Sequence, residues 1–239
     1  MCQTCNDRLH SSRRGFLSAA AGLAIGAGLG SKLAFAAGGE TTRVTADEAL
    51  AKLKAGNARF IQSPQLCSAE LARQRSDVAK HQMPWATILS CADSRVPPEL
   101  LFGGAGIGEL FVARNAGNLA DTATMGTIEY GSAVLGVPLI VVLGHERCGA
   151  VAAACEVVEK QTKFPGSIAP MVAPIVPAAE AVRGRPGDFV DNAIRENAVR
   201  TAKKIATESP LIAELVAKGK VKVVAGRYDL DEGRVEFFA

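Results

Sequence analysis

The chain has 239 residues and 48% of them are hydrophobic, which suits one domain of about 100–200 residues with an extension. The formal net charge is +3, from 27 basic and 24 acidic residues, but four of the basic residues and one acidic residue precede residue 37. The rest of the chain carries 23 residues of each sign, so charge gives no argument for a nucleic-acid partner, and we expect none.

Residues 1–36 have the features of a twin-arginine export signal. The run Ser12–Leu17 (SRRGFL) resembles the twin-arginine consensus, a Gly- and Ala-rich stretch extends to Gly30, and Ala34-Phe35-Ala36 offers a small-residue cleavage site. The apolar stretch is too short and too rich in glycine for a stable membrane span. We therefore predict export to the periplasm and removal of residues 1–36, and the alternative is a disordered basic tail.

The chain has six cysteines, and four of them follow the predicted cleavage site: Cys67, Cys91, Cys148 and Cys155. Four cysteines in a domain of this size are too few for a disulfide framework. Thiols that stay reduced after export need protection, and a bound metal ion would provide it.

In the first half of the chain, apolar strands alternate with predicted helices. Thr45-Ala46-Asp47-Glu48 is typical of a capping box and predicts an amphipathic helix that ends near Phe60. Residues 64–84 form a polar connection with a helix near Ala69–Lys80. The further elements predicted here are strands at Ala86–Ser90, Glu109–Ala113 and Leu139–Leu143, a helix that begins at Pro97-Pro98, and a helix over Thr122–Leu135.

The second half continues the alternation. Residues 162–187 are rich in proline and glycine, and we expect a loop with little regular structure there. The other predicted elements are helices at Cys148–Lys160, Asp188–Thr207 and Pro210–Lys218, and strands at Val221–Tyr228 and Arg234–Phe238 around the turn at residues 231–233. Together the elements predict an α/β fold with a mostly parallel sheet of four to five strands flanked by helices.

Cys91 and His145 each follow an apolar strand, and Cys148 follows His145 by a short turn that leads into a helix. Because ligands gather beyond the carboxyl ends of parallel strands, we expect the three side chains to meet. Two thiols and an imidazole are typical zinc ligands, and a set of three leaves a coordination position for water. The pattern predicts one catalytic zinc ion per chain, and the alternative is that the cysteines are small apolar core residues.

Local backbone features support this site. The N-terminus of the helix at Cys148–Lys160 should favour the thiolate of Cys148. Gly144 and Gly149 should let the backbone approach closely on either side of the predicted ligands.

Three motifs resemble the β-class carbonic anhydrase family. They are C-A-D-S-R at Cys91–Arg95, R-N-A-G-N at Arg114–Asn118 and G-H-E-R-C-G at Gly144–Gly149. The segments Gly226–Asp229 and Gly233–Val235 are also similar to the C-terminal strands of that family. The resemblance covers roughly residues 45–239, so we expect a single carbonic anhydrase domain over residues 37–239.

The resemblance implies roles for five residues. Cys91, His145 and Cys148 match the zinc ligands of the family, and Asp93 and Arg95 match its catalytic pair. Asp93 then accepts a hydrogen bond from the zinc-bound hydroxide while Arg95 holds the carboxylate, although in some members the aspartate becomes a fourth ligand. Without the resemblance, Asp93 and Arg95 would be an ordinary surface ion pair.

The resemblance also implies a substrate pocket. One group of the family has a tryptophan three residues before the first cysteine ligand, and here that residue is Ile88. Another group, which includes plant enzymes, has a glutamine, a phenylalanine and a tyrosine. Gln82 and Tyr130 match two of these positions, and Phe111 matches the third with one residue inserted after Arg95. We place Gly149 in the same pocket.

The resemblance predicts reversible hydration of carbon dioxide to bicarbonate by a homodimer or larger homo-oligomer. Three alternatives stay open: hydrolysis of carbonyl sulfide or carbon disulfide on the same scaffold, zinc binding without catalysis, and thiol redox chemistry of Cys91 and Cys148. The pair Asp93–Arg95 argues against a mere zinc-binding protein, since storage of zinc does not need it.

Overall fold

The computed structural model describes residues 41–62, 74–75 and 78–238. The predicted export signal, residues 1–36, lies outside the described residues, and so does much of the helix predicted near Ala69–Lys80. Among the described helices, none has both the length and the apolar composition needed to cross a membrane.

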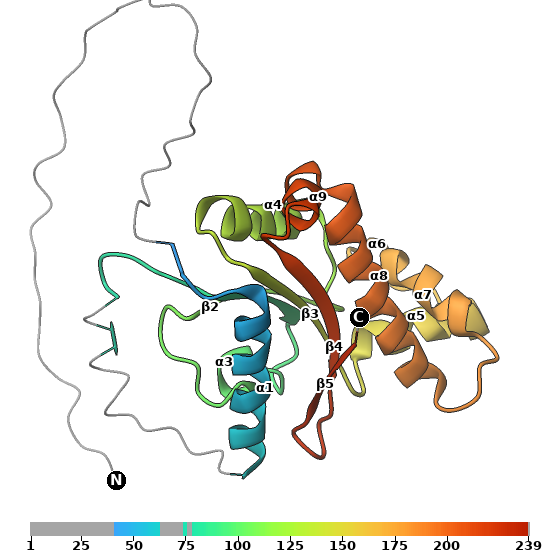
Figure 1. The fold of residues 1–239 in the computed structure, drawn as a ribbon. Helices are drawn as coiled ribbons and strands as arrows, with labels where there is room; N and C mark the ends of the chain where they lie inside the picture. Colours follow the sequence, from blue (N-terminus) through green and yellow to red (C-terminus); the bar gives the residue numbers. More distant parts are fainter. Residues whose placement is uncertain (1–40, 63–73, 76–77, 239) are drawn as a thin grey trace, which may run out of the picture. The chain divides into compact units, whose positions relative to one another are not determined.

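Within the described residues, five strands form one sheet in the order β2-β1-β3-β4-β5 (Figure 1). The strands are β1 (Ala86–Cys91), β2 (Leu110–Asn115), β3 (Leu139–His145), β4 (Lys222–Tyr228) and β5 (Val235–Phe238). Strands β1 to β4 are parallel and β5 is antiparallel to β4, which confirms the predicted mostly parallel sheet. Every residue of β1 and β3 is buried, as expected for central strands covered on both faces.

Strands β1 and β3 extend further than predicted. Cys91 is the last residue of β1 and pairs with Asn115, while His145 is the last residue of β3 and pairs with Tyr228. The two side chains therefore belong to the strand ends instead of following them, and the sheet register itself fixes their positions.

Helices cover both faces of this sheet. They are α1 (Ala46–Gln62), α3 (Pro98–Leu101), α4 (Thr122–Glu129), α5 (Gly149–Lys160), α6 (Ile168–Val172), α7 (Val176–Val182), α8 (Phe189–Glu208) and α9 (Pro210–Ala217). One core joins α1 and α3 to the face that carries Ile88 and Val141, and a second joins α4, α8 and α9 to the face that carries Leu89 and Ile140. In Figure 1, α1 lies on one side of β4 and β5, and α5 to α8 lie on the other.

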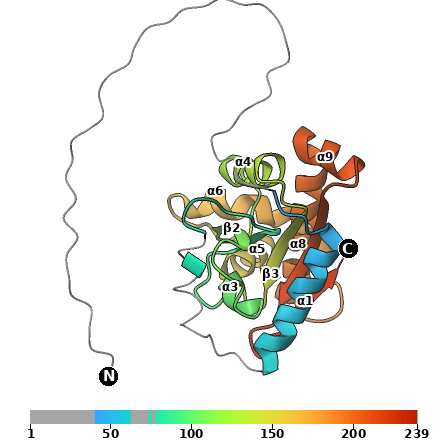
Figure 2. The same ribbon diagram turned by 60° about the vertical axis from the view of Figure 1, so that its left-hand side comes forward.

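Both views place α4 beside α9 (Figures 1 and 2). The Ser209 hydroxyl, which caps α9, donates to the Glu129 carboxylate at the end of α4 (2.6 Å). This bond joins two helices that pack on the same face of the sheet.

The predicted capping box of α1 is confirmed. The Glu48 N–H donates to Thr45 Oγ1 (3.3 Å), and the Thr45 N–H donates to the Glu48 carboxylate (2.8 Å). Further along, a β-carbon at Gly56 would come within 2.1 Å of the Phe102 carbonyl oxygen, so only glycine allows α1 to pack this closely.

Asn57 ties α1 to the rest of the domain. Its buried side chain donates to the carbonyls of Leu101 (3.0 Å) and Gly233 (2.8 Å) and accepts from the Val235 N–H (2.8 Å). One residue of α1 thus joins α3 to the β4–β5 turn and to β5.

The prediction of a loop with little regular structure over residues 162–187 is wrong. This segment contains α6, a 3₁₀ turn η2 (Ala173–Ile175) and α7. Pro174 and Pro177 lie in first turns, where the missing N–H costs no hydrogen bond. Buried apolar residues recur at helical spacing: Val172, Ile175, Ala179 and Val182. Here the prolines mark helix starts.

The helix predicted over Thr122–Leu135 changes type after Glu129. Residues Tyr130–Val134 form a π-helical turn, η1. Within it, a β-carbon at Gly131 would come within 3.0 Å of the Phe111 ring and of the Thr87 hydroxyl, so the turn packs tightly on β1 and β2. Apolar spacing does not distinguish an α-helix from a single π turn.

Candidate metal centre

Three elements bring the predicted ligands together. Cys91 ends β1, His145 ends β3, and Cys148 is the N-cap residue of α5. Their ligand atoms all lie within 4.8 Å of one another, and the two sulfur atoms are 3.9 Å apart. All three side chains are buried. The sequence therefore identified a group that the fold assembles.

The His145 ring is oriented by its own backbone neighbour. Nδ1 lies 2.9 Å from the Glu146 carbonyl oxygen, which can only accept, so Nδ1 is the protonated nitrogen. Nε2 is buried and makes no hydrogen bond to any residue that the structure describes. It faces the sulfur atoms as an unprotonated nitrogen, the form that a metal requires.

The two thiols shift each other's pKa in opposite directions in the metal-free protein. The hydrogen bond with Cys148 lowers the pKa of Cys91, and the Gly117 N–H, 3.5 Å from the sulfur, lowers it further. The same contact with Cys91, together with burial, raises the pKa of Cys148. As expected, the N–H groups of Ala150 and Val151 at the start of α5 lower the pKa of Cys148, but the contact with Cys91 and burial outweigh them in the metal-free protein.

Asp93 and Arg95 form a two-point ion pair beside this group. Arg95 Nε donates to Asp93 Oδ1 (2.9 Å) and Nη2 to Oδ2 (2.7 Å), and the Arg95 N–H also donates to Oδ1 (2.9 Å). These bonds from Arg95 hold the pKa of the Asp93 carboxyl well below its usual range. Oδ2 lies 3.9 Å from His145 Nε2, so an ionised carboxylate borders the ligand atoms.

Arg114 is a site residue whose role the sequence did not show. Its Nε donates to the Cys91 carbonyl (2.9 Å) and its Nη2 to the Asp93 carbonyl (2.6 Å). The guanidinium thus holds the backbone that carries both Cys91 and Asp93. The R-N-A-G-N motif was the available signal, but a motif does not reveal that the contacts are to main-chain atoms.

The rest of that motif forms a tight loop against Cys91. The Asn115 side chain bonds both the N–H and the carbonyl of Leu119 (2.7 Å each) and closes the loop. Gly117 has a φ of 79°, and a β-carbon there would come within 2.6 Å of Ile175. Only glycine brings this N–H to the Cys91 sulfur.

The predicted pocket residues are not brought to the cysteines of the same chain. Phe111 and Tyr130 form a pair with ring centroids 6.2 Å apart, but Phe111 faces Thr87, four register positions before Cys91 and about 13 Å along the strand. Gln82 is exposed and precedes the start of β1, at the opposite end from Cys91.

Two glycines flank the predicted ligands in the segment Gly144–Gly149, which we call the ligand loop, and their surroundings differ. Gly149 lies next to Cys148, but open space surrounds it, so the expected close approach is wrong there. The close approach is found at Gly144, where a β-carbon would come within 3.1 Å of Ile194. Gly149 therefore leaves room beside the ligand atoms, while Gly144 lets β3 pack on α8.

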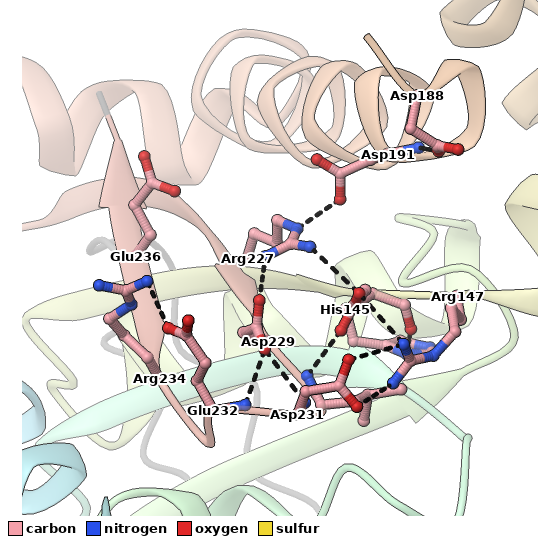
Figure 3. A network of polar contacts seen from close by, with 12 residues as sticks. His145, Arg147, Asp188, Asp191, Arg227, Asp229, Asp231, Glu232, Arg234 and Glu236 are labelled. Atoms are coloured by element: carbon pink, nitrogen blue, oxygen red, sulfur yellow. Dashed lines mark hydrogen bonds and ion pairs between the residues drawn. The ribbon is translucent and has the colours of Figure 1, made fainter.

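The turn between β4 and β5 supports the ligand loop from the other side (Figure 3). Arg147, with a φ of 52°, separates His145 from Cys148 and binds the Asp231 carboxylate with both terminal nitrogens (2.9 Å each). The Glu146 N–H donates to the Tyr228 carbonyl (2.9 Å). The loop that carries two ligands is thus fixed to the C-terminal hairpin.

The ligand group fits a zinc ion. Zinc binds thiolates at about 2.3 Å in tetrahedral geometry, which separates two sulfurs by about 3.8 Å, close to the 3.9 Å found. The buried, unbonded Nε2 of His145 supplies the third ligand atom. The group would supply three of the four ligand atoms of a tetrahedral zinc site, and the Asp93 carboxylate lies beside it.

The chain is thus an α/β domain that gathers two thiols and one imidazole, a Cys₂His group able to hold a metal ion, at the carboxyl ends of its parallel strands. Residues 86–235 match the family model described as carbonic anhydrase. The chain belongs to the β-class carbonic anhydrase family, and its enzyme class is that of the carbonic anhydrases, which are lyases.

Two bacterial relatives have similar sequences. The chain is 38% identical to carbonic anhydrase 2 from Mycobacterium tuberculosis over 182 residues, which cover 76% of this chain and 87% of the relative. It is 37% identical to a carbonic anhydrase from Mycolicibacterium smegmatis over 184 residues, or 77% of this chain and 89% of the relative.

Solved structures show the same fold. The β-carbonic anhydrase of Coccomyxa, in complex with acetazolamide, has a TM-score of 0.61 at 28% identity, over 78% of this chain and 85% of that one. A tetrameric β-carbonic anhydrase of Sordaria macrospora has a TM-score of 0.62 at 25% identity, over 81% and 96%.

Proposed function

We propose that the chain catalyses the zinc-dependent, reversible hydration of carbon dioxide to bicarbonate. The observation that carries this proposal is the convergence of Cys91, His145 and Cys148 beside the Asp93 carboxylate, in a member of the carbonic anhydrase family. Cys91, His145 and Cys148 would hold one zinc ion per chain.

Zinc bound at this site would supply Lewis acidity that makes water a nucleophile near neutral pH. The residues of the chain would hold and orient the groups at the site. Arg95 holds the pKa of Asp93 low, so the ionised carboxylate only accepts hydrogen bonds and would orient a proton donor beside the three ligand residues. Arg114 holds the Asp93 backbone, and the Glu146 carbonyl keeps His145 Nε2 available.

A zinc count and a carbon dioxide hydration assay on a chain that starts at Ala37 test this proposal. We expect about one zinc ion per chain and rapid hydration. Parallel assays with carbonyl sulfide and carbon disulfide address the alternative substrates. Zinc without any of these activities would indicate a zinc-binding protein, and reduced protein that takes up no zinc would refute the site.

We further propose that the chain works as a homo-oligomer with carbon dioxide and bicarbonate as its substrates. The tetrameric enzymes of Sordaria macrospora support an oligomer. If Phe111 lines a pocket at a metal centre, as the resemblance implies, that centre belongs to another subunit, because Phe111 lies about 13 Å along the strand from Cys91 of its own chain. Sedimentation equilibrium tests this, and a monomer at micromolar concentration would contradict it.

Finally, we propose export to the periplasm through the twin-arginine route, on the basis of the sequence of residues 1–36. Replacing Arg13 and Arg14 by lysine should keep the protein in the cytoplasm with its activity unchanged. Cell fractionation measures this outcome, and normal periplasmic delivery of the double variant would refute the proposal.

A further inference from the structure

A partly buried arginine of β4 joins three carboxylates from separate parts of the chain. The side chain of Arg227 is 12% exposed, and its Nε donates to Asp191 at the start of α8. Nη1 donates to Asp229 (3.1 Å), and Nη2 lies 3.8 Å from the Glu146 carboxylate. Figure 3 shows the Arg227 guanidinium between Asp191 and Asp229. A partly buried cation with three anionic partners is well compensated and is held in one orientation.

Glu146 is the residue at which this network meets the metal centre. Its main-chain carbonyl accepts from His145 Nδ1 (2.9 Å). Its carboxylate accepts from the Leu230 N–H (3.1 Å) and from Arg147 Nη1 (3.3 Å) and lies 3.8 Å from Arg227 Nη2. Its own N–H donates to the Tyr228 carbonyl (2.9 Å). The carbonyl that fixes the imidazole therefore belongs to a residue held by β4 and by the turn that follows it.

The position of that carbonyl matters for metal binding. A histidine ligand presents Nε2 to a metal only while Nδ1 keeps its proton and its hydrogen bond, and partners of this kind set both the tautomer and the direction of the ring. A displacement of the Glu146 peptide would turn the ring of His145. Loss of the charge that holds Glu146 should therefore act at Nε2.

We propose that Arg227 is a positioning residue for His145, which acts through Glu146. The inference rests on the proposed zinc-dependent function. It differs from a purely structural role, in which Arg227 would only tie α8 to β4 through Asp191. Arg227 contacts no ligand atom itself.

The chain offers a matched control for the structural role. Arg195 of α8 also binds Asp191 (3.1 Å) and pairs with Glu236 of β5 (2.8 Å). In the described part of the chain, Asp191 and Glu236 are its ion-pair partners, and Glu146 is not among them. Arg195→Gln thus removes an ion pair between α8 and the sheet and leaves Glu146 in place.

The experiment compares Arg227→Gln, Arg227→Lys, Glu146→Gln and Arg195→Gln with the wild type, all as reduced chains that start at Ala37. Zinc affinity is measured by competition with a chelator of known affinity. The visible absorption of the cobalt-substituted proteins reports the ligand geometry, and thermal unfolding of the metal-free proteins reports folding.

We expect Arg227→Gln to bind zinc about 10–100-fold more weakly than the wild type and to shift the cobalt bands. Arg227→Lys keeps the charge and should recover part of the affinity. Glu146→Gln keeps the link between α8 and β4 but loses the charged contacts with Arg227 and Arg147, so it should weaken zinc binding in the same direction. Arg195→Gln should bind zinc within about twofold of the wild type, with unchanged cobalt bands.

Wild-type affinity and spectra in Arg227→Gln would overturn the proposal, and so would an equal loss in Arg195→Gln. If Arg227→Gln does not fold, Glu146→Gln decides, because unchanged zinc binding there would also overturn it. The hydration rate of the wild type is a separate readout: a protein that binds zinc but does not hydrate carbon dioxide would refute the proposed function, while the comparison of zinc affinities would still test Arg227.

Discussion

At the scale of single residues, the charge of Asp93 is the feature on which the proposed reaction depends most directly. Arg95 binds this carboxylate at both oxygens, and Asp93 Oδ2 lies 3.9 Å from His145 Nε2. The carboxylate can therefore act in one of two ways: it can orient a proton donor, or it can move onto the metal as a fourth ligand.

Asp93→Asn separates these two roles. The amide keeps the shape but loses the charge that Arg95 binds. If Asp93 only orients, the variant should keep its zinc and lose about 10²–10⁴-fold in hydration rate. Zinc content and rate are measured on one preparation.

The control is Asp121→Asn, which changes an aspartate that caps α4, where asparagine caps equally well. Both its rate and its zinc content should stay at wild-type levels. Loss of zinc in Asp93→Asn would assign the residue as a ligand, and an unchanged rate would remove it from the mechanism.

The sequence revealed those residues whose side chains act directly. Cys91 and His145 terminate apolar strands, and Cys148 follows at a distance that a short turn spans, so pattern and chemistry sufficed. Arg114 and Glu146 were missed because they act through main-chain carbonyls. Every residue has a main-chain carbonyl. Which carbonyl accepts a hydrogen bond at the site depends on the three-dimensional structure, and the residue type does not show it.

At the scale of elements, the segment over residues 162–187 shows where composition misleads. Its proline and glycine content predicted a loop, although prolines in a first turn are compatible with helices. The strands were easier to predict, because runs such as Leu139–Leu143 are apolar on both faces and short. Their ends were predicted too early, since pairing in the sheet extends them.

Helical packing in this segment predicts the effect of Ile175→Ala. Ile175 is fully buried, and its side chain lies against Gly117 of the loop that bonds Cys91. Truncation should lower the free energy of unfolding by about 2–5 kcal/mol, as for other buried isoleucines. Urea unfolding measures this loss.

Ile168→Ala provides the matched comparison, because Ile168 begins α6 and is 45% exposed. Its effect should stay within about 0.5 kcal/mol. Equal small effects of both substitutions would mean that the segment does not pack as α6 to α7.

At the scale of the whole molecule, carboxylates that are stabilised in the folded state make the domain sensitive to acid. The Thr124 N–H lowers the pKa of Asp121, and the Glu232 N–H, together with Arg227, lowers the pKa of Asp229. A carboxyl whose folded pKa lies below its unfolded value, near 3.9, contributes stability above that value and loses it as the pH falls through the folded pKa.

The free energy of unfolding of the metal-free protein should therefore fall as the pH decreases below about 4. Asp229→Asn should flatten this fall, because asparagine keeps the turn but has no charge to lose. Glu156→Gln changes an exposed carboxylate of α5 and should leave the slope unchanged. Urea unfolding at pH 5, 4 and 3 gives the slopes, and a wild-type slope in Asp229→Asn would contradict the argument.

The metal centre also bears on the stability of the whole domain, because its ligands lie at the ends of β1 and β3 and at the start of α5. A ligand that binds only the folded state stabilises it by about 4 kcal/mol when its free concentration is about 1,000 times its dissociation constant.

In reduced protein, buffered zinc should therefore raise the unfolding temperature of the wild type. Cys148→Ala, which lacks one ligand, should lose this rise. Cys155→Ala removes a buried thiol outside the ligand group and should show the full rise from a lower starting temperature. Differential scanning calorimetry with and without zinc measures all three. An equal rise in Cys148→Ala would place the stabilising metal elsewhere in the chain and would remove the main physical support for a zinc centre formed by Cys91, His145 and Cys148.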